Sequence, residues 1–165
     1  MLNLIKKEEI MSNYIAKISW SRDECEKFTD QKYSRIHNWQ FEGGLNISAS
    51  PSHHIVPIPY SDPDLVDPEQ AFVASISSCH MLFFLDLCSR KKIIVDEYND
   101  QAEGILGKDD GGNMAMTVVT LKPRTSFSGE NIPTQSEVEK IHHKAHQLCF
   151  IANSVKTKIV TDLGF

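Results

Sequence analysis

Apolar and polar residues alternate along several short stretches near the beginning of the chain, which is the pattern of half-buried β-strands. The first stretch runs from Tyr14 to Trp20, and two more, Arg35 to Glu42 and Leu45 to Ala49, flank Gly43-Gly44. A glycine pair between alternating stretches indicates a hairpin, because its turn positions can need a positive φ. We therefore expect these strands to open a meander.

A long and almost wholly apolar helix is predicted in the middle of the chain. Asp67 can cap its start, Pro68 suits the first helical position, and Glu69 complements the positive end of the helix dipole. From there to about Arg90 the apolar residues fall on every side, so this helix should be central to the fold. Residues 51–63, which precede it, are rich in proline and predict a long loop of the kind that lines sites.

Strands and one more helix are predicted after the central helix. Residues 98–106 and 114–122 should form strands that are joined by a turn at 109–112. Ser136 and Glu139 have the spacing of a capping box and predict the start of a second helix. The apolar stripe of that helix comprises Val138, Ile141, Ala145, Leu148 and Ala152.

Length and charge narrow the class of protein. The 165 residues fit a single domain, 1–165, in which residues 1–10 are expected to be a disordered or upstream-start extension. A net charge of -5 argues against binding nucleic acid or an anionic membrane, because both need clustered Lys and Arg. The longest apolar stretch, Met81 to Leu85, is far shorter than the roughly 20 residues that span a bilayer, and residues 1–10 do not have the apolar core of a secretory signal. We expect a soluble, cytoplasmic protein.

The four cysteines lie far apart and form no CxxC motif, so the sequence predicts neither a disulfide framework nor a zinc ribbon. Cys88 lies nine residues beyond Cys79, on the opposite side of the same helix, and carboxylates flank Cys25. Cys79 differs because polar residues surround it inside an apolar helix, where polar groups need partners or a purpose. Simple packing of a buried cysteine is the alternative interpretation.

Cys149 is a candidate partner for Cys79. It falls at the edge of the apolar stripe of the second helix, so it should face the central helix. Two thiols on facing helices suit a peroxidatic and a resolving cysteine: the first attacks a peroxide and becomes a sulfenic acid, which condenses with the second to a disulfide. This chemistry requires a lowered thiol pKa, which a nearby cation can provide.

Arg35 is the candidate cation. It is predicted on the same strand face as Trp39 and Phe41, where its head group either reaches solvent or is buried with an anion. Glu69 could orient the guanidinium through a bidentate pair. Because Glu69 and Cys79 are ten residues apart, about 15 Å along one helix, a shared site requires a bend or a second subunit. We therefore expect a dimer with shared sites.

A competing pattern lies in the second helix. His142, His146 and Cys149 are spaced i, i+4 and i+7, which places three metal-ligand types along one helical line. Solvated histidines on a polar face, or a supporting role beside Cys149, are the other interpretations. We assign no metal ligand from this pattern.

At this point the sequence resembles a known family, the OsmC/Ohr group of organic hydroperoxide reductases, in its OsmC-like branch. The resemblance spans nearly everything after Met11. The matching motifs, in chain order, are Tyr33-Ser34-Arg35-Ile36-His37, Gly43-Gly44, Asp67-Pro68-Glu69-Gln70, Ser77-Ser78-Cys79-His80-Met81 and Ala145-His146-Gln147-Leu148-Cys149-Phe150-Ile151-Ala152-Asn153-Ser154.

The resemblance implies an α+β, OsmC-like fold in which curved antiparallel sheets surround long central helices and two subunits intertwine as a homodimer. It also implies roles for four residues: Cys79 as the peroxidatic thiol, Cys149 as the resolving thiol, Arg35 as the activator of the thiolate, and Glu69 as the acid that orients the arginine. No bound cofactor is implied. The family's reductant is an external dithiol such as dihydrolipoamide.

Three hypotheses follow for the function. The leading one is a thiol-dependent peroxidase that reduces organic hydroperoxides to alcohols, in a site walled by Trp39, Met81, Phe83 and Phe84. The second is a non-enzymatic module that binds a metal through His146 and Cys149, or a hydrophobic ligand in the same pocket. The third keeps the fold and has no chemistry.

Overall fold

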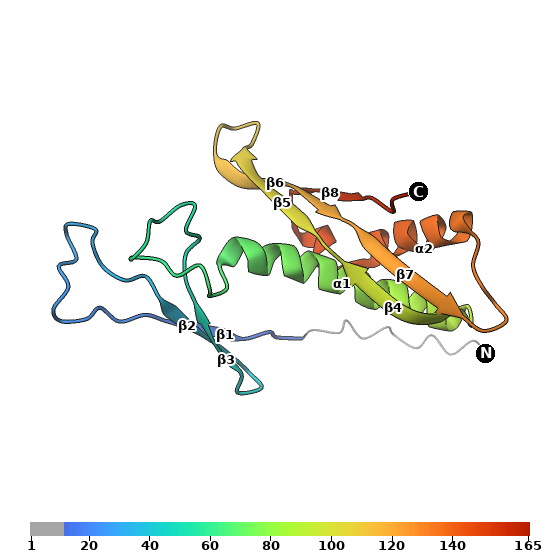
Figure 1. Ribbon diagram of the computed structural model, residues 1–165, viewed down its shortest axis with the longest axis horizontal. Coiled ribbons are helices and arrows are strands. Elements are labelled where there is room, and N and C mark those ends of the chain that lie inside the picture. The colour runs from blue at the N-terminus through green and yellow to red at the C-terminus, as the bar shows by residue number, and fades with distance from the viewer. Residues whose placement is uncertain (1–11) are drawn as a thin grey trace, which may run out of the picture. The chain divides into compact units, whose positions relative to one another are not determined.

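The computed structural model describes residues 12–165, and these divide into two compact units, with the boundary along the chain between Asp67 and Pro68. The first unit is a small sheet with a long loop. The second contains both α-helices and the remaining strands (Figure 1). The predicted extension at residues 1–10 lies outside the described residues, and the single domain over 1–165 stays a prediction.

The first unit contains a three-stranded antiparallel sheet in the order β1-β2-β3. The hairpin predicted at Gly43-Gly44 is confirmed, because Gly44 has a φ of +84° and the amide of Phe41 donates to the carbonyl of Leu45. The strands are shorter than predicted. Their bounds are Ala16–Ser19 for β1, His37–Phe41 for β2 and Asn46–Ala49 for β3.

The inward face of β2 is confirmed, but the half-buried β1 is not. His37, Trp39 and Phe41 are partly buried and their neighbours are exposed, and the indole of Trp39 donates to Nε2 of His37 at 2.8 Å. Every residue of β1 is exposed. Arg35 precedes β2 and is not part of the strand, because its amide donates to the carbonyl of Tyr60 in the loop. The loop predicted at 51–63 is confirmed, since it contains no helix or strand.

The second unit begins with α1, Pro68–Arg90, at the predicted bounds. Its buried residues follow one stripe, Ile76, His80, Phe84 and Cys88, at a spacing of four. This corrects the expectation of a helix buried on every side, because Leu82 is 60% exposed in the chain. The helix contacts α2, β4, β5 and β6.

By length and composition α1 could also cross a membrane. The core helix of a soluble protein meets the same criteria. Here the buried stripe packs against protein, and the helix carries polar groups such as Ser77, His80 and Asp86 that a lipid-facing helix disfavours. These features favour a helix that packs against protein over one that faces lipid.

One predicted strand proves to be two. The stretch 98–106 is interrupted at Gln101–Ala102. Residues before the interruption end one strand, at Asp100, and residues after it begin the next, at Glu103. At the interruption the amide of Lys122 donates to the Asp100 carboxylate at 2.6 Å. The Asp100 side chain thus takes the place of a backbone carbonyl as the acceptor for the Lys122 amide. The alternation of apolar and polar residues does not reveal such a replacement.

The same interruption separates two sheets. The turn predicted at 109–112 is confirmed, because the amide of Gly112 donates to the carbonyl of Asp109. The first sheet pairs β4, Ile94–Asp100, with β7, Pro123–Ser128. The second has the order β5-β6-β8, formed by Glu103–Lys108, Met114–Leu121 and Lys158–Thr161, with β8 parallel to β6.

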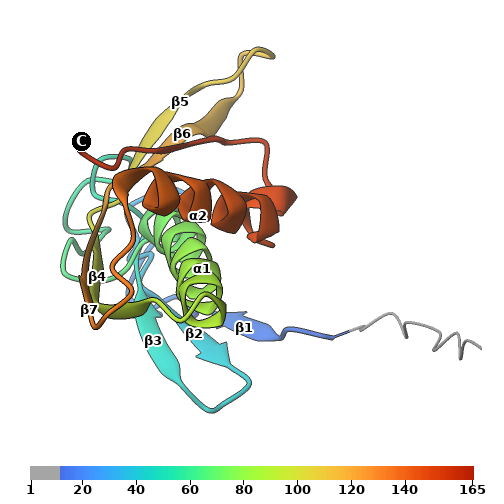
Figure 2. The ribbon, with the colours of Figure 1, turned by 90° about the vertical axis from the view of Figure 1, so that its right-hand side faces the viewer.

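The second helix, α2, spans Gln135–Leu148 and packs beside α1 (Figure 2). Its capping box is formed by Thr134 and Glu137, not by Ser136 and Glu139, although both pairs have the same spacing. The helix is followed by a short 3-10 helix, η1, at Ala152–Ser154. The core between the helices includes Phe84, Cys88, Val138, Ile141 and Ala145.

Candidate functional site

Cys79 and Cys149 meet between α1 and α2, close enough for their side chains to interact. Cys79 lies in the middle of α1 and is partly exposed, whereas Cys149 is fully buried. Cys149 is the C-cap of α2, with an extended ψ of 113°, so it follows the helix instead of belonging to it. The predicted contact between the two thiols is therefore present, and both are in the reduced form.

The surroundings of Cys149 keep its proton in place. Burial, followed by the hydrogen bond with Cys79, raises its pKa to about 11, although the amides of Ala152 and Ile151 oppose the shift. A hydrogen bond raises the pKa of a thiol when the protonated form donates it. Burial and the contact with Cys79 therefore both favour the protonated form of Cys149. Of the two sulfurs, Cys79 is the one that has access to solvent.

The other two thiols lie elsewhere, as the sequence predicts. Cys88 is a core residue at 0% exposure, and burial raises its pKa to about 11. Cys25 is exposed in the first unit.

The apolar surroundings differ from the predicted wall of the site. Phe83 packs edge-on against Phe150, with ring centroids 5.1 Å apart, and Phe150 is 71% exposed. Phe84 is fully buried and stacks on His142, so it cannot line an open site. Phe150, which directly follows Cys149, is the aromatic residue that the sequence reasoning missed.

A pair of buried histidines joins α1 and α2. His80 follows Cys79 in α1, and its Nε2 is 2.9 Å from Nδ1 of His142 in α2. The rings are nearly parallel, at 7°, and the residues are 1% and 2% exposed. Burial lowers the pKa of His80 to about 4 and that of His142 to about 3, so both imidazoles are neutral at physiological pH.

This pair decides between the interpretations of the second helix. His142 is buried and bonded to His80, so the expectation of a solvated residue is wrong for it, while its neighbour His143 is exposed. Within residues 12–165 no group of three or more His, Cys, Asp or Glu side chains could hold a metal ion. The spacing of His142 and Cys149 does place both toward α1, since i and i+7 share a helix face.

Arg35 and Glu69 belong to different units. The guanidinium of Arg35 donates to the carbonyls of Tyr33 and Gln31 at 3.1 and 3.0 Å and stacks on the ring of Tyr33. Glu69 is in the first turn of α1, and its Oε2 is buried without a hydrogen-bond partner among the described residues. The pairing of Arg35 with Glu69 and with Cys79 stays a prediction.

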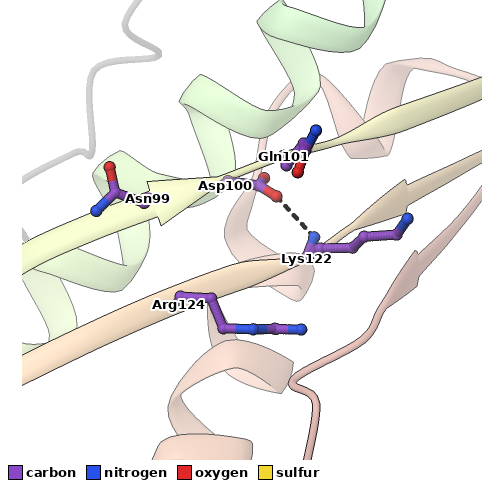
Figure 3. A pocket seen from close by; sticks show the side chains of 5 residues that line it. All are labelled: Asn99, Asp100, Gln101, Lys122 and Arg124. Atoms are coloured by element: carbon purple, nitrogen blue, oxygen red, sulfur yellow. Dashed lines mark hydrogen bonds between the residues drawn. The ribbon is translucent and has the colours of Figure 1, made fainter.

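A pocket of about 380 Å³ lies at the interruption between the two sheets (Figure 3). In Figure 3 the Asp100 carboxylate points toward the backbone amide of Lys122. Both cations of the pocket have partners, since Lys122 pairs with Glu103 at 2.7 Å and Arg124 donates to backbone carbonyls. The pocket is lined by Asn99, Asp100, Gln101, Lys122 and Arg124. No thiol is among these residues, so the pocket is distinct from the contact between Cys79 and Cys149.

The family described as OsmC-like protein matches residues 61–164, which include both cysteines. The chain belongs to the OsmC-like protein family. A solved OsmC-like protein of unknown function from Vibrio cholerae is 51% identical, with a TM-score of 0.91, over 92% of this chain and 99% of that one.

More distant structures share the OsmC-like fold. An organic hydroperoxide resistance protein from Elizabethkingia anophelis is 18% identical, with a TM-score of 0.67, over 92% of this chain and 93% of that one. An organic hydroperoxide resistance protein OsmC from Legionella pneumophila is 17% identical, with a TM-score of 0.63, over 93% and 96%. No curated protein matches the sequence. The α+β, OsmC-like fold expected from the sequence is therefore confirmed.

Proposed function

We propose that the protein is a thiol-dependent peroxidase that reduces organic hydroperoxides to alcohols. The observation that carries this proposal is the contact between a partly exposed Cys79 and a fully buried Cys149. Membership of the OsmC-like family supports it, and so do the names of the organic hydroperoxide resistance proteins that share the fold.

The first step takes place at Cys79. Its thiolate attacks the terminal oxygen of the hydroperoxide, the O–O bond breaks, and the departing alkoxide takes up a proton to become the alcohol. Cys79 is left as a sulfenic acid. The exposed ring of Phe150, packed on Phe83, offers an apolar surface for the organic part of the substrate.

The second step joins the two sulfurs. Cys149 attacks the sulfenic sulfur of Cys79, and the hydroxide that leaves combines with the thiol proton of Cys149 to form water. An external dithiol, such as dihydrolipoamide, then reduces the Cys79–Cys149 disulfide by exchange and becomes a disulfide itself.

Arg35 and Glu69 complete the proposed site. A guanidinium beside Cys79 favours the thiolate, and a carboxylate can hold that guanidinium in a bidentate pair. The buried Oε2 of Glu69 has no partner among the described residues, which suits the arrival of a cation. In this proposal Arg35 comes from the same chain or from a second copy in a homodimer, and the protein acts in the cytoplasm.

The test follows peroxide and disulfide together. The reduced protein receives one equivalent of cumene hydroperoxide, and peptide mass spectrometry then maps disulfides. A Cys79–Cys149 bond should form in the wild type and in the matched control Cys25→Ser. Cys79→Ser should consume no peroxide. Cys149→Ser should stop at a sulfenic acid that dimedone traps on Cys79. Unconsumed peroxide with both thiols still free would rule out the proposal.

A further inference from the structure

The hydrogen bond between His80 and His142 is a second polar contact across the two helices that carry the thiols. Cys79 and His80 are consecutive in α1, and His142 and Cys149 share one face of the α2 line. The imidazole bond and the thiol contact therefore span the same interface, at two separate points.

The rest of this interface is apolar. Phe84, Cys88, Val138, Ile141 and Ala145 form its core. Apolar burial stabilises the association of the helices, but it is not directional and allows one helix to shift along the other. A hydrogen bond between two buried rings is directional, because it weakens when the rings move by a fraction of an ångström.

The histidine pair is an unusual choice if packing were its only role. Burying two imidazoles costs desolvation energy that an apolar pair of similar volume would not. The bond satisfies one nitrogen of each ring, yet Nδ1 of His80 remains buried without a partner among the described residues. The hydroxyl of Tyr98, whose ring lies beside His142, is also unpaired there. The histidine pair is therefore less stabilising than apolar side chains of similar volume would be. This cost indicates that the pair has a role besides packing.

We infer that the His80–His142 bond fixes the register of α1 against α2 that keeps the Cys79 and Cys149 sulfurs within reach of each other. Both histidines are positioning residues for the formation of the disulfide, and neither exchanges a proton with substrate. Burial keeps both rings neutral, which preserves a bond with one donor and one acceptor. This inference rests on the proposed function, because the disulfide forms in the second step of the proposed reaction.

The test measures the Cys79–Cys149 disulfide at equilibrium with glutathione, so it does not depend on peroxidase activity. The variant His142→Phe removes the bond and retains an aromatic ring on Phe84. We expect its disulfide equilibrium constant to fall about tenfold, which raises the reduction potential by about 30 mV. Its melting temperature in the reduced form should fall, because the change removes one member of the pair and leaves the buried ring of His80 with neither nitrogen bonded to a described residue.

Two further variants distinguish the effect of losing the His80–His142 hydrogen bond from the effect of changing the shape of the side chain. His142→Asn places an amide near the position of Nδ1 and should restore most of the equilibrium constant. His143→Phe makes the same change at the exposed neighbouring position and should match the wild type. If His142→Phe does not fold, His80→Phe removes the same bond from α1 and is measured in its place.

Two outcomes would overturn the inference. One is an equilibrium constant for His142→Phe equal to that of the wild type, and the other is an equal loss in His142→Asn and His142→Phe. A wild type that forms the disulfide in glutathione but does not consume peroxide would remove the proposed function and leave this inference standing.

Discussion

The hydroxyl of Ser77 in α1 donates a hydrogen bond to Oδ2 of Asp100 at the end of β4. The other oxygen of Asp100 accepts from the amide of Lys122, in the link between β6 and β7. The carboxylate of Asp100, at the end of β4, thus joins α1 to the link between β6 and β7, at the point where the two sheets separate. It also lies close enough to His80 to favour the charged imidazole, against the larger effect of burial.

Replacing Asp100 should destabilise the second unit. Asp100→Ala leaves the Lys122 amide and the Ser77 hydroxyl without their acceptor, and the loss of two bonds to a charged group should cost about 2 to 4 kcal/mol. Urea denaturation followed by circular dichroism measures this free energy. Asp110→Ala, at an exposed position in the turn of 109–112, is the control and should change it by less than about 0.5 kcal/mol. Equal effects of the two changes would contradict the role given to Asp100.

Stability should fall as the pH is lowered below the ordinary histidine range. The unfolded chain binds protons at His80 and His142 near pH 6.5, whereas in the folded protein their pKa values are about 4 and about 3. Between these limits the unfolded state binds more protons, so the free energy of unfolding decreases as pH falls and levels off below the folded values. From pH 7 to 5.5 the loss should be about 2 to 3 kcal/mol, at about 1.4 kcal/mol per pH unit for each ring.

The control for this pH dependence is His142→Phe, which should lose about half of the slope. The charged groups that face the pair are His146 from α2, which lowers the pKa of His80, and Asp100 from β4, which raises it. Both remain in the variant, so they cancel in the comparison. An unchanged slope would show that the histidine pair is not the cause.

The four thiols should react with iodoacetamide in two classes at pH 8. Cys149 and Cys88 are buried and have pKa values near 11, so they should remain unmodified, while the accessible Cys79 and Cys25 are alkylated. Peptide mass spectrometry over a time course gives each rate. Rapid modification of Cys149 in the folded protein would contradict its assignment as the protonated partner. In Cys79→Ala, the loss of the hydrogen bond should lower the pKa of Cys149 and increase its labelling above pH 9.

Removing Arg35 should slow the reaction with peroxide if the proposed site is correct. We expect Arg35→Ala to reduce the rate of peroxide consumption by about 10- to 100-fold, in line with the loss of one stabilising charge. Glu69→Gln should have a smaller effect in the same direction. Arg90→Ala removes an exposed arginine that pairs with Asp86 on the surface, and it should leave the rate unchanged. Equal rates in Arg35→Ala and the wild type would remove Arg35 from the site.

The sequence predicts those parts of the fold in which local signals and tertiary structure agree. Pro68 and the residues around it define the start of α1, and the glycine pair defines the first hairpin, because in both cases one residue type suits one backbone geometry. The predicted capping box is wrong by two residues, because Thr134 and Ser136 both precede a glutamate by three positions. The choice between them depends on packing that the spacing does not contain.

The same limit applies to the site. The face of Cys149 follows from helical periodicity, and its meeting with Cys79 was predicted correctly. That periodicity also assigns His142 to the same face, but a partner for His142 on another helix depends on a register that only the packed structure defines. The strand break at Gln101–Ala102 was missed for a related reason, because the acceptor of the Lys122 amide is a distant side chain.

The position of Cys149 at the very end of α2 gives the two sulfurs unequal freedom. Cys79 is held within a continuous helix of 23 residues, whereas the backbone has left the helical conformation at Cys149 before η1 begins. A disulfide requires the sulfurs to approach to about 2.05 Å, much closer than a hydrogen bond allows. Because Cys149 lies outside the regular part of α2, a local change at its backbone can supply that movement without unwinding either helix. In the proposed cycle, Cys79 would therefore keep its place in α1 while Cys149 makes the approach, and the core between the helices would stay packed.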